Sequence, residues 1–127
     1  MEDVMIRISV LWIFAAVAMS AHYVMLFFEP DVLQKTGTGA NSRLAIGEAF
    51  VNWLIPLTMA FLSVTLGGLA NRYLNMVLGG LYILLSIFHV AKCPMVHISN
   101  KPSVHQLLIC ISTVVVTALI FWYAWTW

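Results

Sequence analysis

The chain has 127 residues, of which 62% are hydrophobic and 9% are charged. Soluble domains average roughly 45–50% apolar and about 25% charged residues, so a water-soluble fold could not hide this much apolar surface. The net charge of +1, from six basic and five acidic residues, is too small for a nucleic-acid-binding surface. The composition therefore predicts an integral membrane protein that contacts the lipid bilayer and does not bind nucleic acid.

Four long apolar segments divide the chain, at about 4–28, 43–66, 72–91 and 104–127. A helical span needs about 20 residues, which each segment supplies. The alternation of apolar and polar residues that marks barrel strands is absent, and backbone groups in lipid must be satisfied within each segment. We therefore predict an all-α fold, with one transmembrane domain forming an up-and-down four-helix bundle and both termini on one side of the membrane.

Polar segments and helix breakers separate the predicted helices. The segments 29–43 and 92–103 are polar and contain prolines, which predicts loops. Gly67 and Gly68 predict the end of the second helix, and the motif NRYLN at 71–75 predicts a tight turn into the third. The result is two longer loops at one face of the membrane and one short turn at the other.

The charges near the ends of the spans predict an orientation. Four basic residues lie at the face of loops 29–43 and 92–103, against two at the other face: Lys35, Arg43, Lys92 and Lys101 against Arg7 and Arg72. The positive-inside rule then places both loops in the cytoplasm and the termini outside. Glu2 and Asp3, together with the length of the first run, differ from the basic start and short core of a signal peptide, so a retained helix is predicted.

Small and polar residues recur at helical spacing, which indicates the faces that pack against other helices. The stripes are Ala15, Ala18, His22 and Met25 on the first helix; Glu48, Asn52 and Met59 on the second; Asn75, Gly79, Tyr82, Ser86 and His89 on the third; and, on the fourth, Gln106, Cys110, Thr113 and Thr117 beside a neighbouring stripe of His105, Ser112 and Leu119. Pro56 cannot donate to the carbonyl of Asn52, so a kink is expected there.

Each predicted helix carries one ionisable residue near the same membrane face. Because the helices alternate in direction, His22, Glu48, His89 and His105 all fall within roughly 2–9 Å of that boundary at 1.5 Å per residue. Burying such a group without a partner costs several kcal/mol, so ionisable residues inside a membrane are candidates for function.

Three interpretations of this cluster remain open. In the first, Glu48, Asn52, His22 and Ser86 form an ion or substrate pocket beside the Pro56 kink, in a transport- or channel-like protein or an accessory subunit. In the second, the cluster binds a cofactor. The metal-ligand set for copper or zinc would be His22, Glu48, His89 and His105, with Cys93, Met95 and His97 of the adjoining loop as further ligands. A haem held by His22 and His89 is the other cofactor alternative.

The third interpretation is structural. Glu48 near a helix N-terminus is favoured by the helix dipole, and the histidines would simply fasten helices together. No cofactor is predicted under the first or third interpretation. No nucleophile motif or glycine-rich phosphate loop is present, so no enzymatic activity is assigned. A homo-oligomer, or a subunit of a membrane complex, is expected.

Four pieces of the chain carry a family resemblance: LWIF at 11–14, IPLTMAFLS at 55–63, NRYLN at 71–75 and WYAWTW at 122–127. With them the chain resembles uncharacterised bacterial four-transmembrane-helix proteins, in which an Asn-Arg-x-x-Asn turn follows a proline-bearing second helix. The resemblance implies the same architecture and the bacterial inner membrane, and it implies no activity. This chain departs from the family at Leu54 and Thr113, where acids are typical.

Overall fold

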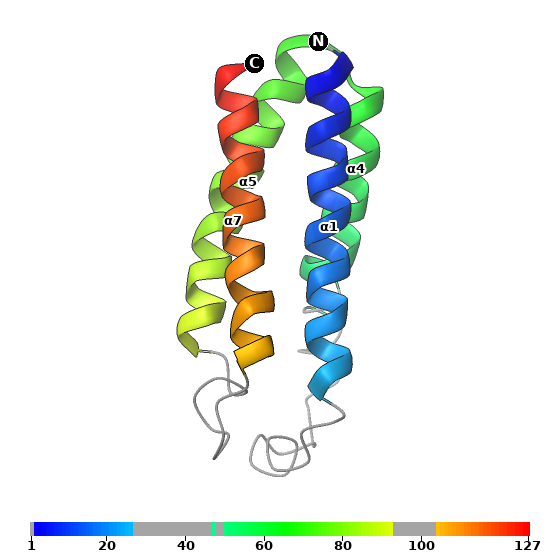
Figure 1. The fold of residues 1–127 in the computed structure, drawn as a ribbon. Coiled ribbons are helices and arrows are strands. Elements are labelled where there is room, and N and C mark those ends of the chain that lie inside the picture. Colours follow the sequence, from blue (N-terminus) through cyan, green and yellow to red (C-terminus); the bar gives the residue numbers. More distant parts are fainter. Residues whose placement is uncertain (1, 27–46, 48–49, 93–103) are drawn as a thin grey trace.

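The computed structural model describes residues 2–26, 47, 50–92 and 104–127. This part of the chain is helical: α1 (Glu2–Leu26), the π-helical turn η1 (Phe50–Leu54) that leads into α4 (Ile55–Thr65), α5 (Gly68–Lys92) and α7 (Val104–Thr126). The helices run up and down beside one another, and both termini lie at one end (Figure 1). We call this the terminal end, and the opposite end, where α5 finishes and α7 begins, the loop end. The predicted all-α four-helix bundle is confirmed.

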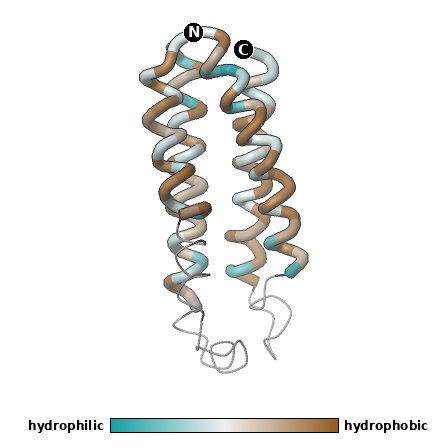
Figure 2. The backbone as a smooth tube through the Cα atoms, turned by 180° about the vertical axis from the view of Figure 1, so that it is seen from behind, coloured by the Kyte–Doolittle hydropathy of each residue, from teal (hydrophilic) through white to brown (hydrophobic). Residues whose placement is uncertain are grey.

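Three of the helices are long and apolar enough to cross a membrane: Glu2–Met25, Gly68–Lys92 and Val104–Thr126. The apolar stretch Phe50–Thr65 is shorter. Large apolar side chains point outward all along the bundle, Phe61, Leu84 and Phe88 among them, and hydrophobic residues recur along each helix (Figure 2). Lipid is the solvent that such a surface requires, so the chain is a multi-pass membrane protein. Its orientation in the membrane stays a prediction.

The helices pack unevenly around the bundle. α1 packs against α4 and α7, and α7 also packs against α5, whereas α4 and α5 contact each other over a short stretch only. α5 approaches α7 closely at Gly79, where an added Cβ would lie 3.3 Å from Cγ2 of Ile120 and 3.3 Å from the backbone nitrogen of Phe121. The seam between α4 and α5 is thus the loosely packed side of the bundle.

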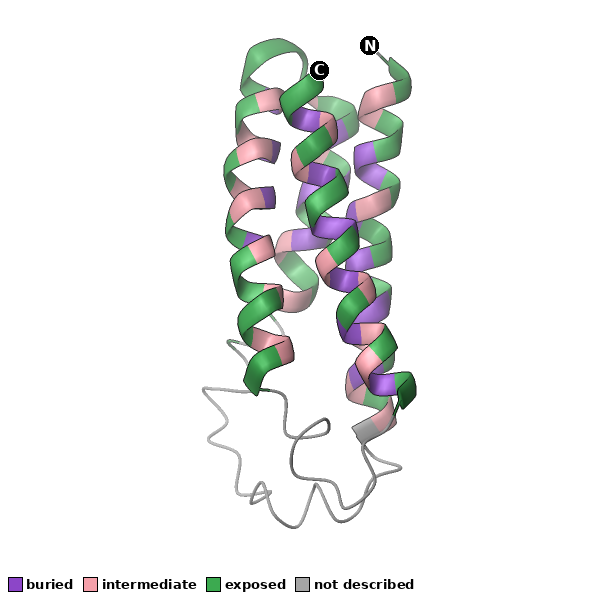
Figure 3. Ribbon diagram, turned by 60° about the vertical axis from the view of Figure 1, so that its left-hand side comes forward, coloured by how far each residue is buried: buried purple, intermediate pink, exposed green. Residues whose placement is uncertain are grey.

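Buried residues line the inner faces of the helices (Figure 3). They include most of the predicted stripes: Ala15, Ala18 and His22 on α1, Met59 on α4, Asn75, Gly79 and Tyr82 on α5, and Gln106, Cys110, Thr113 and Thr117 on α7. Of the neighbouring α7 stripe, His105 and Leu119 are exposed and Ser112 is half-buried. The sequence pattern therefore identified the inward faces, and the structure decides between the two stripes on α7.

The NRYLN motif lies inside α5 and is not a turn, so this prediction was wrong. The chain turns earlier, at Leu66 and Gly67, and Gly68 has a φ of 68°, which suits glycine. The side chain of Asn71 donates to the carbonyls of Ser63 at 2.9 Å and Leu66 at 2.8 Å, which are orphan acceptors at the end of α4. The polar side chain of Asn71, which suggested a turn, instead caps the C-terminal end of α4.

Arg72, the next residue of the motif, does the same for another helix. Its Nε and Nη2 donate to the carbonyls of Ala124 at 3.2 Å and Trp125 at 2.8 Å, at the C-terminal end of α7. A cation at a helix C-terminus is also favoured by the helix dipole. The motif thereby ties α5 to both α4 and α7.

Asn75 completes a buried polar network at the terminal end. Its Oδ1 accepts from Nε1 of Trp12 at 2.7 Å and from Oγ of Ser63 at 3.1 Å, and its Nδ2 donates to Oδ1 of Asn71 at 2.6 Å. Trp12, Ser63, Asn71 and Asn75 are all 0% exposed. A buried network whose members are all bonded rigidifies the helices that it joins, here α1, α4 and α5.

The π-helical turn η1 lies just before Pro56, the position at which a kink was predicted. In a π-helix the carbonyl of residue 51 would accept from the N–H of residue 56, which proline lacks. The hydroxyl of Tyr82 on α5 donates to the carbonyl of Val51 instead. One hydroxyl therefore satisfies the acceptor that Pro56 leaves open and links α5 to η1.

Candidate functional site

A cavity of about 310 Å³ lies within the bundle. All four helical segments line it, with Ala15, Met19 and Tyr23 from α1, Val51, Asn52 and Pro56 from η1 and α4, Tyr82, Leu85, Ser86, Phe88, His89 and Lys92 from α5, and Thr113 and Thr117 from α7. Its volume falls at the lower end of the roughly 300–1,000 Å³ of small-molecule sites. The loosely packed seam between α4 and α5 therefore encloses space for a ligand.

The cavity occupies one half of the bundle. Along α5 its lining runs from Tyr82 to the exposed Lys92 at the loop end, a rise of about 15 Å at 1.5 Å per residue. That is about half of a hydrocarbon core of roughly 30 Å. The other half is filled by buried side chains such as Ile8, Trp12 and Ile120. The space therefore reaches the loop end and is closed toward the terminal end.

Many of the polar groups that line the cavity are already engaged in hydrogen bonds within the protein. Asn52 donates from Nδ2 to the hydroxyl of Tyr23 at 3.1 Å. The hydroxyls of Thr113 and Thr117 donate to carbonyls of their own helix, at 2.7 Å and 2.9 Å. The remaining wall is largely apolar. A ligand would therefore be held mainly by apolar contact and oriented by a small number of polar groups.

Two histidines meet beside this cavity. Nε2 of His22 on α1 lies 3.1 Å from Nε2 of His89 on α5, and the ring planes are inclined by 77°. His22 is buried, and His89 is half-buried and forms part of the cavity wall. The cluster is thus shared between the packed interior and the cavity.

α7 contributes two further side chains to the pair. Nδ1 of His22 lies 2.9 Å from Oε1 of Gln106 and 3.6 Å from Sγ of Cys110. Because an amide oxygen can only accept, His22 carries its proton on Nδ1, and its Nε2 lone pair faces His89. We call His22, His89, Cys110 and Gln106 the histidine cluster; one ligand atom from each of the first three lies within 4.8 Å of those of the other two.

The amide of Gln106 is only half satisfied. Gln106 is 0% exposed, and its Nε2 is the one buried side-chain nitrogen or oxygen among the described residues that has no hydrogen-bond partner. A buried donor without an acceptor costs about 1–3 kcal/mol. The cluster therefore holds a hydrogen-bond donor that the protein alone does not use.

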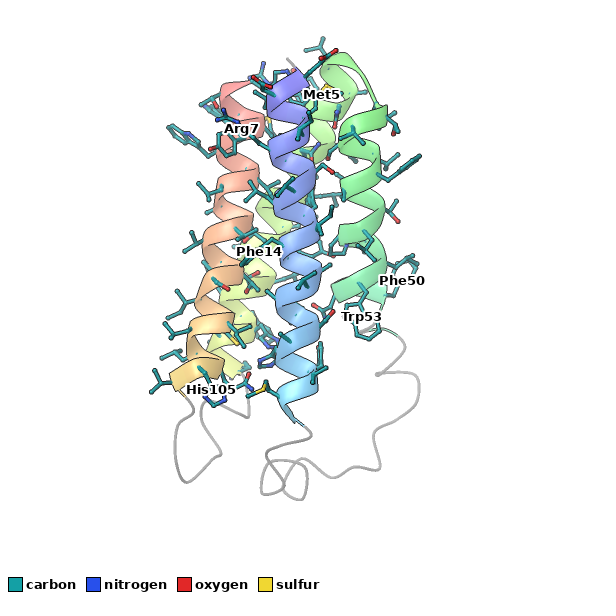
Figure 4. All side chains as sticks on the ribbon, turned by 45° about the vertical axis from the view of Figure 1, so that its right-hand side comes forward. Met5, Arg7, Phe14, Phe50, Trp53 and His105 are labelled. Atoms are coloured by element: carbon teal, nitrogen blue, oxygen red, sulfur yellow. The ribbon has the colours of Figure 1, made fainter. Side chains whose placement is uncertain are left out.

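The structure brings some of the predicted site residues together. His22 and His89 are in contact, and Asn52, Ser86 and His89 line the cavity. His105 is exposed at the start of α7 and belongs to no described ligand group (Figure 4). Glu48, Cys93, Met95 and His97 lie outside the described residues.

Sequence reasoning did not assign Cys110 or Gln106 to a site. Both stand on the predicted inward stripe of the fourth span, one helical turn apart. An amide and a thiol on the inner face of an otherwise apolar helix are the signal that could have identified them. Nothing in the sequence indicates that they face His22 in particular.

A haem does not fit between the two histidines as they stand. Two axial bonds of about 2 Å each would separate the coordinating nitrogens by about 4 Å, with the porphyrin between the rings. The Nε2 atoms are 3.1 Å apart and directly in contact. Of the cofactor alternatives, the arrangement therefore favours a bare metal ion.

Comparison of the chain with protein-family models, with curated proteins and with solved structures finds no match in any of the three. The fold and the site define its class as a small multi-pass helical membrane protein. Among the described residues, the cavity and the histidine cluster are the two features from which a function can be argued.

Proposed function

We propose that the protein binds a small amphipathic solute in the cavity, entering from the loop end, as the binding step of membrane transport. The observation that carries this is the one-sided cavity, which reaches the exposed Lys92 and ends against buried side chains at mid-bundle. Transport sites typically lie near the bilayer midplane and are accessible from one side at a time.

The lining favours a solute with an apolar body and an anionic head. Most of the described wall is apolar by area, Ser86 and Asn52 supply hydrogen-bonding groups, and the described lining includes Lys92 but no carboxylate. An ammonium at the rim would attract a carboxylate and guide the rest of the molecule inward. A small aromatic or aliphatic carboxylate meets these requirements.

The walls next to the cavity include a segment suited to movement. η1 is a π-helical turn, a feature that often occurs at functional sites. It ends at Leu54, just before Pro56 in the first turn of α4. α4 contacts α5 over a short stretch only. A shift of η1 away from α5, with loss of the Tyr82–Val51 hydrogen bond, would widen the cavity while Asn71 and Asn75 hold α4 to α5 at the terminal end.

Thiol accessibility tests the one-sided cavity. Ser86→Cys, in a chain with both native cysteines replaced by serine, should react with a charged thiol reagent added at the loop end. The matched control is Leu84→Cys, at the same depth but 66% exposed on the outer surface; in lipid it should stay unreactive. Equal protection of both positions would contradict a water-accessible cavity.

Uptake by proteoliposomes tests the solute class. We expect saturable uptake of radiolabelled benzoate, abolished by Ser86→Phe, which fills the cavity, and weakened about tenfold by Lys92→Gln. Leu84→Phe on the outer surface is the control and should leave uptake unchanged. Uptake that is unchanged in both Ser86→Phe and Lys92→Gln would refute the proposal.

A further inference from the structure

We propose that His22, His89 and Cys110 bind one Cu(I) ion and that Gln106 orients His22 toward it. The inference concerns the histidine cluster and does not depend on the proposed transport of a solute. It begins from three ligand groups, carried by three different helices, that converge within 4.8 Å of one another. Helix packing alone does not require two imidazoles and one thiol from separate helices to converge at one point.

The geometry is close to that of a three-coordinate site. With bonds of about 2.0 Å to nitrogen and about 2.3 Å to sulfur, ligand atoms around a trigonal ion lie roughly 3.5–3.8 Å apart. The two Nε2 atoms are 3.1 Å apart, so the rings need to part by only a few tenths of an ångström. Sγ of Cys110 lies 3.6 Å from Nδ1 of His22, the nitrogen that faces Gln106, so Sγ would have to rotate about its side-chain torsion to reach an ion on Nε2.

Gln106 fixes the ring of His22 in the tautomer that a metal needs. Its Oε1 accepts from Nδ1 at 2.9 Å, which leaves the Nε2 lone pair for the ion. Metal-binding histidines typically donate their other N–H to such an acceptor. The unpaired Nε2 of the same amide is fully buried, one helical turn from Cys110 along α7.

Charge decides between copper and zinc. A thiolate and two neutral imidazoles with Cu(I) make a site of zero net charge, whereas the same ligands with Zn(II) leave one positive charge. Burying a net charge within the membrane costs several kcal/mol. Thiolate ligands suit both ions, so the charge balance is what separates them. The interior position therefore favours the monovalent ion.

Binding is a ligand exchange without a change in oxidation state. The thiol of Cys110 loses its proton to water as the S–Cu bond forms, and the His22–His89 hydrogen bond is replaced by two N–Cu bonds. Because protons compete for all three ligands, acidification should release the ion. The cavity offers an entry route, since His89 forms part of its wall.

The test is a titration of the purified full-length chain in detergent micelles with Cu(I), without oxygen, against a colorimetric Cu(I) chelator. We expect one ion per chain, and X-ray absorption showing two nitrogen ligands and one sulfur ligand. Cys110→Ser and His22→Gln should each weaken binding at least 100-fold, and Gln106→Leu about 10- to 100-fold.

Two controls keep the result interpretable. His105→Gln changes an exposed histidine of the same helix as Cys110, and Cys93→Ser changes the other cysteine; both should leave the affinity unchanged. Circular dichroism confirms that each variant is folded. Absence of Cu(I) binding by the folded chain, or undiminished binding by Cys110→Ser and His22→Gln, would overturn the proposal. Tighter binding of Zn(II) through the same ligands would overturn the assignment to copper.

Discussion

Replacing Asn75 with alanine should destabilise the bundle at its terminal end. The substitution removes the acceptor of Trp12 Nε1, at 2.7 Å, and the donor to Oδ1 of Asn71, at 2.6 Å. Both partners are 0% exposed, so solvent cannot replace the lost hydrogen bonds. Ser63 is less affected, because its hydroxyl can still donate to the carbonyl of Met59 at 2.6 Å.

Two competing figures bound the size of the effect. A buried polar group left without a partner costs about 1–3 kcal/mol in soluble proteins. Hydrogen bonds between membrane helices average only about 0.6 kcal/mol, with a maximum near 1.7 kcal/mol. With two groups orphaned, we expect Asn75→Ala to lower the free energy of unfolding by about 2–3 kcal/mol, toward the upper end for membrane bonds because the donor is fully enclosed.

The assay is reversible unfolding by sodium dodecyl sulfate in mixed micelles, followed by circular dichroism. Trp12→Phe removes the donor, so Asn75→Ala should cost about 1 kcal/mol less in that background. Ser112→Ala is the control, since its hydroxyl bonds only to its own helix, at 2.7 Å, and the residue is half-buried. If Asn75→Ala changes stability no more than this control, or if the two substitutions are strictly additive, the reasoning is refuted.

Three further changes test other contacts. Gly79→Ala should destabilise the bundle by about 1–3 kcal/mol, because the added Cβ would lie 3.3 Å from atoms of α7. Gly80→Ala is the control: its Cβ would make only ordinary contacts, so it should cost under about 0.5 kcal/mol in the same unfolding assay. Tyr82→Phe should cost about 0.6–1.7 kcal/mol, since it leaves the carbonyl of Val51 without its donor; an unchanged unfolding midpoint would count against the π-turn argument. Glu48→Gln should abolish the pH dependence of benzoate uptake if that acid couples protons to transport; an identical pH profile would remove it from the mechanism.

Composition and periodicity were enough to predict the helices and most of their inward faces. A bilayer demands long apolar helices. Within such helices, small and polar residues are enriched where helices contact each other, as at Ala15, Gly79 and Thr117. The depth argument also placed His22 and His89 near one membrane face, because helices that alternate in direction bring such positions together. Their contact at 3.1 Å agrees with that expectation.

Rotation of a helix about its own axis is what the sequence did not determine. His105 and Gln106 are neighbours, about 100° apart around α7. Either could have faced the bundle, and the structure buries Gln106 and exposes His105. The ligand group therefore contains Cys110, four residues beyond Gln106 on the buried face, in place of the histidine that its chemistry had suggested.

The turn propensity of asparagine led to the wrong prediction for the motif at 71–75. Asparagine favours turns because its side chain can bond nearby backbone groups. Asn71 does bond backbone carbonyls, but those of α4, from within α5. The sequence could not show these acceptors, since they come together with Asn71 only once the two helices are packed.

The contact of His22 on α1 with His89 on α5 underlies the histidine cluster, and solid-state NMR of the protein in lipid bilayers tests it directly. With ¹⁵N-labelled histidine, dipolar recoupling should give a strong contact between the Nε2 nuclei of His22 and His89, at about the 3.1 Å of the structure. The contact should vanish in His89→Gln and persist in His105→Gln. A separation beyond about twice a hydrogen-bond length would contradict the histidine cluster and the site built on it.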